Sequence, residues 1–105
     1  MTLTIKKGTS NEGTLINVQG EVDLYTSPDL RTAIMEAVGS AEAGVAVDLG
    51  EVEYMDSSGV ATLVEGFKRA HERSKSFKLV APSHAVMKVL ELAKLDGIFE
   101  IEPAS

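Results

Sequence analysis

The residues of this chain whose types could do chemistry are Asp56-Ser57-Ser58-Gly59, between a strand-like run and a helical apolar pattern. Serine and aspartate are preferred helix caps, so we expect either Asp56 or Ser57 to cap this helix. The remaining polar groups are then free for another role. A serine hydroxyl at a helix start can accept phosphate, because unpaired N–H groups and the macrodipole favour an anion there. That phosphate adds about −1.5 to −2 charge at neutral pH.

Hydrolysis by a nucleophilic serine is the competing chemistry at such a turn. The nucleophile elbow needs G-x-S-x-G, whereas the sequence here is Met55-Asp56-Ser57-Ser58-Gly59. A serine nucleophile also needs a base within reach, and nothing in the sequence places a histidine there. We therefore predict that the chain is not an enzyme.

The two histidines give no support to a metal site. Neither His71 nor His84 lies in a cluster with ligand spacing. We expect His71 to pack on the apolar face of its helix or at its rim, and His84 to face solvent. The chain also lacks the P-loop and G-x-G-x-x-G patterns, so we predict neither a metal nor a cofactor.

Composition limits the possible partners. A chain of 105 residues predicts a single domain spanning 1–105. The net charge of −6, without a compensating basic run, disfavours direct binding to nucleic acid. The apolar runs are too short for membrane insertion, and no signal peptide is visible. With no cysteine in the chain, a cytoplasmic location is the simplest expectation.

The first elements expected from the pattern are two strands. Residues 2–7 and 14–19 alternate between apolar and polar, and turn formers fill 10–13. We predict an antiparallel hairpin that ends at Gly20. Residues 44–49 form a short apolar run, which predicts a strand buried on both faces.

A helix start is marked at Ser27-Pro28-Asp29, with Ser27 as the predicted cap and Pro28 in the first helical position. Its apolar face recurs at helical spacing, and Gly39 is a natural stop. That face comprises Leu30, Ala33, Ile34, Ala37 and Val38.

The second helix follows the serine turn and has one apolar and one polar face. The apolar face comprises Val60, Leu63, Val64, Phe67, Ala70 and His71. The polar face comprises Thr62, Glu65, Lys68, Arg69, Glu72 and Arg73.

The remaining segments complete an alternating order of strands and helices. Residues 77–81 form a strand, and Pro82-Ser83 opens a third helix with Val86, Val89, Leu90 and Ala93 on its apolar face. Residues 98–101 could add an edge strand. Strands separated by helices favour parallel pairing.

Three stretches together resemble the STAS domain of the anti-sigma factor antagonist (anti-anti-sigma) family. Gly20-Glu21-Val22-Asp23 follows a strand, Met55-Asp56-Ser57-Ser58-Gly59 opens the central helix, and LVAPSHAVMKVLELAKLDGIFEI closes the chain. The match runs from about residue 3 to residue 102. The resemblance implies an α/β fold whose mixed sheet starts with the antiparallel hairpin and continues with parallel strands, packed with about three to four helices.

The resemblance also implies a partner-switching protein. In that family the unphosphorylated antagonist binds an ATP-dependent serine kinase that also serves as the anti-sigma factor. The kinase phosphorylates the serine after the motif aspartate, and a PP2C-type phosphatase reverses this. Carried over by motif position, the phosphoacceptor is Ser57, flanked by Asp56 and Ser58. Asp23 would contact the kinase or serve as a turn residue, and Gly59 would let the partner's backbone approach or serve the turn.

The expected contact surface is therefore the loop 56–58 with the exposed start of the second helix, including Thr62 and Glu65. Glu21 and Asp23 are expected nearby at the same end of the molecule.

One departure from the family pattern keeps an alternative open. Family members often continue D-S-S-G-L-G, whereas this chain has Gly59-Val60-Ala61. The segment SGVATLVEGFKRA also resembles STAS subunits of ABC-type lipid transporters. Those subunits brace an ATPase subunit and need no phosphorylation, which gives a second hypothesis for the function.

Overall fold

The computed structural model describes residues 2–10, 13–40 and 43–104. The strands are β1 (Leu3–Ser10), β2 (Gly13–Val22), β3 (Gly44–Met55), β4 (Ser76–Val80) and β5 (Glu100–Glu102). The helices are α1 (Ser27–Ser40), α2 (Ser57–Glu72) and α3 (His84–Leu92). The predicted order of elements is confirmed, and the final strand begins two residues later than expected.

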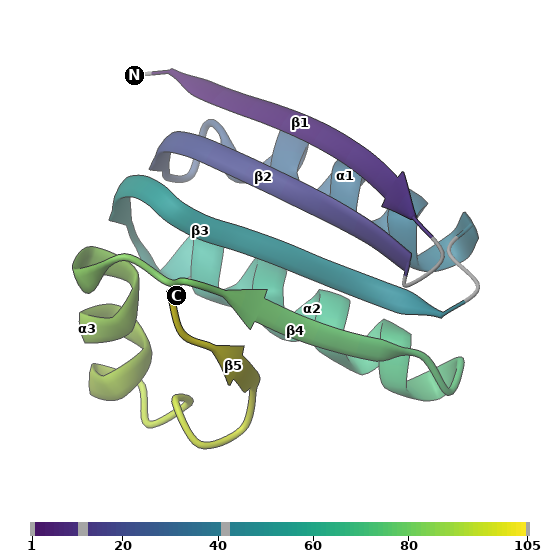
Figure 1. Ribbon diagram of the computed structural model, residues 1–105. Coiled ribbons are helices and arrows are strands. Elements are labelled where there is room, and N and C mark those ends of the chain that lie inside the picture. The colour runs from purple at the N-terminus through teal and green to yellow at the C-terminus, as the bar shows by residue number, and fades with distance from the viewer. Residues whose placement is uncertain (1, 11–12, 41–42, 105) are drawn as a thin grey trace.

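The five strands form one mixed sheet in the order β1-β2-β3-β4-β5. β1 pairs with β2 antiparallel, and β2, β3, β4 and β5 pair in parallel with their neighbours, as predicted (Figure 1). The predicted hairpin turn at 10–13 includes residues 11–12, which lie outside the described residues.

The helices α1 and α2 lie side by side behind the sheet in Figure 1 and cover one of its faces. The prediction that 44–49 is buried on both faces is wrong. Val45, Val47 and Leu49 are buried, but Ala46 and Asp48 between them are only half-buried. The reason is that these two side chains point to the other face, which the helices leave uncovered.

The core lies between the sheet and the helices. It draws on every helix and on the inward residues of the central strands, and each fully buried aliphatic side chain stabilises the fold by about 1.5–3 kcal/mol. Its largest members include Ile16, Leu30, Ile34, Leu49, Leu63, Leu79 and Leu90.

Three strands run further than their sequence patterns indicate. β1 was predicted to end at residue 7 and continues to Ser10. β2 continues past Gly20 to Val22, so the predicted end at Gly20 is wrong. Gly20 has φ +113°, and a Cβ there would lie 2.3 Å from the carbonyl oxygen of Thr2. Glycine therefore lets the strand continue through a close backbone approach, with a shift of register towards β3. β3 likewise extends to Met55.

The first helix is also longer than expected. α1 begins at Ser27 itself, and the Leu30 N–H donates to the carbonyl oxygen of Thr26, so the cap position is Thr26 and the predicted cap at Ser27 is wrong by one residue. The helix continues through Gly39 to Ser40. The predicted apolar face is confirmed, since all five of its members are buried.

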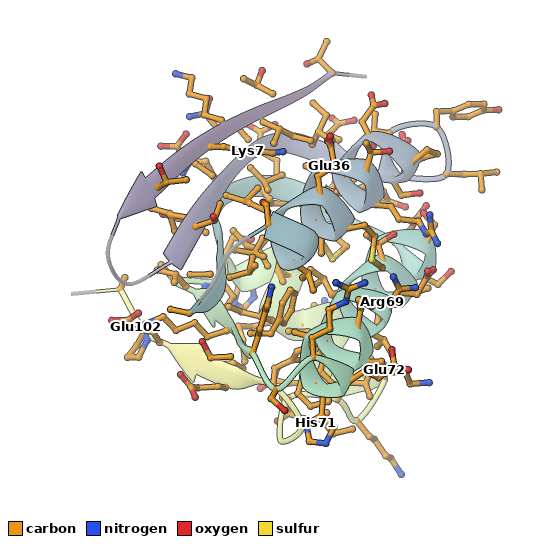
Figure 2. All side chains as sticks on the ribbon, turned by 90° about the vertical axis from the view of Figure 1, so that its right-hand side faces the viewer. Lys7, Glu36, Arg69, His71, Glu72 and Glu102 are labelled. Carbon is orange, nitrogen blue, oxygen red and sulfur yellow. The ribbon has the colours of Figure 1, made fainter. Side chains whose placement is uncertain are left out.

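The outer end of α2 carries His71 at the rim of the covered face, one of the two placements expected for it. His71 is exposed (Figure 2), and its ring stacks on Phe67 with centroids 6.3 Å apart. It lies in the last turn of the helix. Two surface ion pairs are labelled in Figure 2: Arg69 with Glu72 within α2, and Lys7 of β1 with Glu36 of α1, each with N···O of 3.6 Å.

The third helix begins as predicted. Ser83 is its N-cap, and the Ser83 hydroxyl accepts a hydrogen bond from the Val86 N–H at 3.3 Å. His84 is exposed, as expected. Within the described parts of the chain, no helix is long and apolar enough to cross a membrane.

Candidate functional site

The loops that follow β2, β3 and β4 lie at one end of the molecule, on the left in Figure 1. The Asp56 N–H donates to the carbonyl oxygen of Val22 at 3.1 Å, which joins the ends of β2 and β3 directly. In α/β sheets, ligands and partners bind at the carboxyl ends of the parallel strands. Both sequence motifs, Gly20–Asp23 and Met55–Gly59, therefore meet at the end where a site is expected.

The residue that caps α2 is Asp56, one of the two residues proposed for that role. Its Oδ1 atom accepts hydrogen bonds from the Ser58 N–H at 2.9 Å and from the Ser58 hydroxyl at 2.5 Å. Its carbonyl oxygen accepts from the N–H groups of Gly59 and Val60 at 3.1 and 3.2 Å. Asp56 thus accepts hydrogen bonds from three N–H groups of the first turn of the helix.

The two serines of the motif differ in what their hydroxyls do. The Ser58 side chain is half-buried and its hydroxyl is held by Asp56. Ser57 is exposed, and among the described residues its hydroxyl takes part in no hydrogen bond. The expectation that the Ser57 hydroxyl projects into solvent from the helix start is confirmed.

Gly59 does not belong to the exposed surface. The residue is buried, and a Cβ there would lie 2.7 Å from Met55 Cγ and 2.8 Å from Val22 Cγ1. The expectation that Gly59 lets a partner approach is therefore wrong. Its lack of a side chain lets the helix start pack directly against the ends of β2 and β3.

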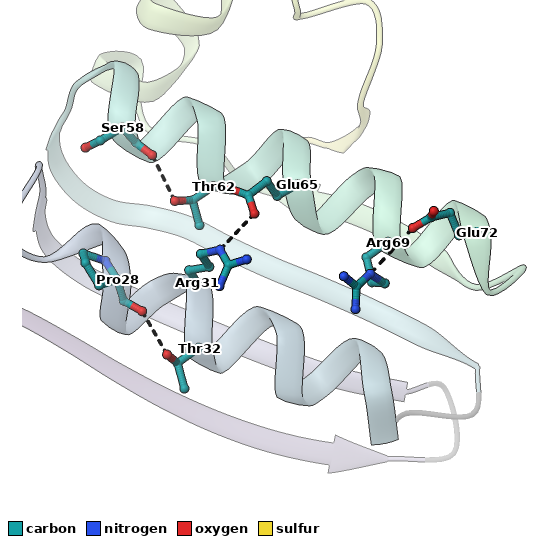
Figure 3. A network of polar contacts seen from close by, with 8 residues as sticks. All are labelled: Pro28, Arg31, Thr32, Ser58, Thr62, Glu65, Arg69 and Glu72. Atoms are coloured by element: carbon teal, nitrogen blue, oxygen red, sulfur yellow. Dashed lines mark hydrogen bonds and ion pairs between the residues drawn. The ribbon is translucent and has the colours of Figure 1, made fainter.

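The prediction that Thr62 lies on the exposed face of α2 is also wrong. Only 4% of the surface of Thr62 is accessible. Its hydroxyl donates to the carbonyl oxygen of Ser58 at 2.9 Å (Figure 3). The physical reason is that α1 packs along this flank of α2 and covers it.

Glu65 lies at the same flank but stays accessible, as expected. Its Oε2 atom accepts from Arg31 Nε of α1 at 2.8 Å, and the two side chains are 46% and 53% exposed (Figure 3). Glu65 therefore bridges the two helices at the rim of the site.

Asp23 follows β2 and organises the next loop. Only 6% of its surface is exposed, and its Oδ1 atom accepts from the N–H groups of Tyr25 at 2.9 Å and Thr26 at 3.0 Å. The hydrogen bond from the Thr26 N–H lowers the pKa of Asp23 below its usual value, against the opposing effect of burial. The predicted turn role of Asp23 is confirmed.

Glu21 and Asp23 lie at the expected end and share an uncommon property. The Oε2 atom of Glu21 and the Oδ2 atom of Asp23 are buried and accept no hydrogen bond from the described residues. Buried polar atoms without a partner are rare and costly. In the sheet Glu21 pairs with Tyr54, two residues before the Asp56 cap.

A shallow apolar groove of about 640 Å³ extends from Ser57 between α2 and α3. Its α2 wall includes Val60, Ala61 and Val64, and its α3 wall includes Val89 and Leu92. Leu92 is 76% exposed and was not proposed from the sequence. The sequence shows that Leu92 is one of several apolar residues in α3. Apolar periodicity alone does not show which of these residues lack a packing partner and stay exposed.

The described residues contain no group of three or more His, Asp or Glu side chains that could hold a metal ion. The site thus offers an accessible hydroxyl, an apolar groove and buried carboxylates. This arrangement suits recognition of a protein surface and modification of the hydroxyl.

Comparison with known proteins links this geometry to a family. The family model described as "Mlab, STAS domain" matches residues 5–101. An anti-sigma-B factor antagonist of Listeria monocytogenes is 35% identical over 89 residues, which cover 83% of this chain and 76% of the relative.

Solved structures agree in fold. The crystal structure of an anti-sigma factor antagonist from Mycobacterium paratuberculosis has a TM-score of 0.88 and 26% identity, and covers 98% of this chain and 87% of that chain. The Bacillus cell fate determinant SpoIIAA in its phosphorylated form has a TM-score of 0.76 and 22% identity, and covers 97% of this chain and 92% of that chain. At this identity the second likeness establishes the fold alone.

Proposed function

The chain belongs to the STAS domain family, among the anti-sigma factor antagonists, and on this premise we propose that it is a phosphorylation-controlled partner-switching protein. With Ser57 unmodified, it binds an anti-sigma serine kinase and so frees the sigma factor. Phosphate on Ser57 releases the kinase. The chain acts as a kinase substrate in the cytoplasm, where ATP is available, and not as a catalyst.

The observation that carries this proposal is the free hydroxyl of Ser57. It is exposed at the start of α2, whereas the hydroxyl of the adjacent Ser58 already donates to Asp56. A kinase must bring an acceptor oxygen in line with its nucleotide, and a hydroxyl held by a cap is poorly placed for that step. Ser57 is therefore the acceptor and Ser58 is not.

The groove beside Ser57 supports a protein partner. It is lined mainly by aliphatic side chains, and it starts at the residue that is to be modified. Accessible apolar surface of this kind is typical of the centre of a protein interface. A partner seated in the groove would cover Ser57, Val60 and Val64 together, with Glu65 at the rim.

The effect of phosphate follows from the helix start. The N–H groups of Ser58, Gly59 and Val60 already donate to Asp56. The expectation that unpaired N–H groups at this helix start favour an anion is therefore wrong for these three groups, and the Asp56 carboxylate lies next to an added phosphate. A phosphate on the exposed Ser57 hydroxyl breaks none of these hydrogen bonds, so it leaves the fold intact. It places about −1.5 to −2 charge at the partner surface, where repulsion and steric mismatch weaken binding.

The first experiment asks which serine accepts phosphate. Each anti-sigma-type serine kinase encoded in the source genome is purified and incubated with the chain and ATP, and intact mass is measured. We expect one phosphoryl group on the wild type and on Ser58→Ala, and none on Ser57→Ala. Absence of phosphate on the wild type with every kinase, or phosphate on Ser58, would contradict the proposal.

The second experiment measures the switch itself. Calorimetry with the same kinase compares the unmodified and the phosphorylated chain, and we expect an affinity at least about tenfold lower after phosphorylation, since each 1.4 kcal/mol is tenfold. Treatment with a PP2C-type phosphatase is expected to restore binding. Equal affinity of the two forms would refute the release step.

The second candidate function is an accessory subunit that braces the ATPase of an ABC-type lipid transporter. The groove between α2 and α3 favours it, because an apolar groove can hold a partner whether or not Ser57 is modified. Stable co-purification with an ATPase subunit, unchanged in Ser57→Ala and in the phosphorylated chain, would favour this function over the first.

A further inference from the structure

The loop between β2 and α1 displays two large apolar side chains. Leu24 is 69% exposed and Tyr25 is 87% exposed, which makes Tyr25 the most exposed large hydrophobic residue that the structure describes. Tyrosine presents a large, rigid contact area with few rotatable bonds, and it is enriched among residues that dominate binding energy. We call Leu24 and Tyr25 together the apolar tip.

The loop that carries the apolar tip is held rigidly. The N–H groups of Tyr25 and Thr26 donate to Asp23 Oδ1, and the Asp23 N–H donates to the Thr26 hydroxyl oxygen at 2.9 Å. The Thr26 hydroxyl donates to the carbonyl oxygen of Glu21 at 2.8 Å, and the Ser27 N–H donates to that of Asp23 at 2.8 Å. The tip is thus fixed in an exposed position by hydrogen bonds that leave Leu24 and Tyr25 outside the core.

Holding the loop in this way has a cost. Asp23 is buried, yet its Oδ2 atom accepts no hydrogen bond from the described residues. A buried carboxylate oxygen without a partner lowers stability, so a loop selected for stability alone would avoid it. A loop fixed beforehand for binding explains both the cost and the exposed side chains, because preorganisation reduces the entropy lost on association.

The apolar tip lies at the same end of the sheet as Ser57. Asp56, which precedes Ser57, donates its N–H to Val22, which precedes Asp23. The other highly exposed apolar residue, Leu92, lies in the groove that Ser57 also lines. A partner that reaches Ser57 therefore meets the groove on one side and the apolar tip on the other.

We propose that the apolar tip, Leu24 and Tyr25, inserts into an apolar pocket of the same kinase that the Ser57 surface binds. Asp23 is a positioning residue that holds the tip and does not itself touch the kinase. This inference rests on the proposed function and deepens it. Asp29 lies exposed in the first turn of α1, four residues after Tyr25, in a chain of net charge −6, so the kinase pocket is expected to have a basic rim.

The test uses the kinase that phosphorylates Ser57 and measures its affinity for variants of the full chain by calorimetry. We expect Tyr25→Ala to raise the Kd about thirtyfold or more and Leu24→Ala to raise it about tenfold. Tyr25→Phe keeps the ring and is expected to stay within about threefold of the wild type. The matched control is Leu15→Ala, because Leu15 is 44% exposed on the uncovered face of the sheet at the start of β2.

The positioning role of Asp23 has its own readout. Asp23→Asn is expected to raise the Kd and to accelerate amide hydrogen exchange at Tyr25 and Thr26, whereas Tyr25→Ala raises the Kd without faster exchange at Thr26. Slow exchange at both amides in Asp23→Asn together with weakened binding would show that Asp23 contacts the kinase directly, and would overturn the positioning role.

The outcomes separate this inference from the proposed function. If the wild type is phosphorylated on Ser57 and bound, but Tyr25→Ala binds as tightly, the tip proposal is overturned and the function stands. If Tyr25→Ala abolishes self-association or vesicle binding of the chain while kinase affinity is unchanged, the tip serves a second copy or a lipid surface instead. If no kinase binds the wild type, both proposals are refuted.

Discussion

The two aspartates at the ends of β2 and β3 form a natural pair for comparison. Asp23 and Asp56 each follow a strand, and each accepts a hydrogen bond from the N–H two residues later, that of Tyr25 or Ser58. The local hydrogen-bond arrangement is the same in both loops. The difference is that Asp23 is buried with one oxygen that accepts no hydrogen bond from the described residues, whereas Asp56 is only half-buried at the start of a helix.

What each loop displays depends on the residue that follows its aspartate. After Asp23 come Leu24 and Tyr25, so the fixed backbone presents apolar surface. After Asp56 comes Ser57, so the fixed backbone presents a hydroxyl. A shared way of holding the chain thus supports two kinds of contact side by side, one for binding and one for modification.

The largest expected effect comes from the residue on which both loops depend. Gly59→Ala would bring a Cβ within 2.7 Å of Met55 and 2.8 Å of Val22, at the ends of both strands. We expect a loss of about 1–3 kcal/mol in the free energy of unfolding, measured by urea denaturation. Gly39→Ala is the control: a Cβ there meets nothing within 4 Å, so it should be neutral or stabilising. Equal stability of Gly59→Ala and wild type would show that the two loops are not coupled through this contact.

The next effect tests how the charge of Asp23 contributes to stability at different pH. The pKa of Asp23 is lowered in the folded state by its backbone hydrogen bonds, so its charge contributes stability above the unfolded-state pKa of about 3.9. That contribution is lost as the pH falls through the lower folded-state pKa. We expect the difference in unfolding free energy between wild type and Asp23→Asn to be largest at neutral pH and to shrink below about pH 4. A difference that does not change with pH would contradict the role of the charge.

Removal of the second aspartate tests the cap. Asp56→Ala removes the acceptor for the Ser58 N–H at the start of α2, and we expect a loss of about 1 kcal/mol in unfolding free energy. Ser58→Ala leaves that backbone hydrogen bond in place and should cost less. If the two variants lose the same stability, the hydroxyl rather than the N–H is the important donor.

The smallest change in unfolding free energy is expected at the rim of the site, at the ion pair of Glu65 with Arg31. Glu65→Gln breaks the ion pair with Arg31 between α1 and α2, which is about half exposed at both partners. We expect a loss of about 0.2–1 kcal/mol that disappears at high salt, because exposed ion pairs are screened. Urea denaturation at low and high ionic strength checks this, and a loss that is independent of salt would point to packing instead.

Much of the fold could be predicted because it follows local rules. The apolar spacing of Leu30, Ile34 and Val38 predicted the buried face of α1, and the chemistry of Ser83 predicted the start of α3. The hairpin and the parallel order followed from turn residues and from helices between strands. Strand ends were less predictable. Gly20 was predicted to end β2, but its lack of a side chain lets β2 continue close to the backbone of Thr2.

The site was predicted in part. Residue preference narrowed the cap of α2 to Asp56 or Ser57, and the resemblance named Ser57 as the phosphoacceptor. The structure places the cap at Asp56 and leaves Ser57 exposed. Thr62 was expected at the surface, because its place in the helical pattern is polar, but α1 covers it. The exposure of Leu24 and Tyr25 carries no sequence signal, since a short loop has no periodicity from which burial can be inferred.

The sequence by itself therefore determined the order of the elements, the polarity of most faces and the N-cap of α3. Only the tertiary structure decided which of Asp56 and Ser57 caps α2, that Gly59 is a packing contact, that Thr62 is covered, and that the apolar tip lies at the same end of the sheet as Ser57. The physical reason is distance along the chain. Caps and periodic faces depend on neighbours a few residues away, whereas burial of Gly59 depends on Val22, which the chain reaches only after folding.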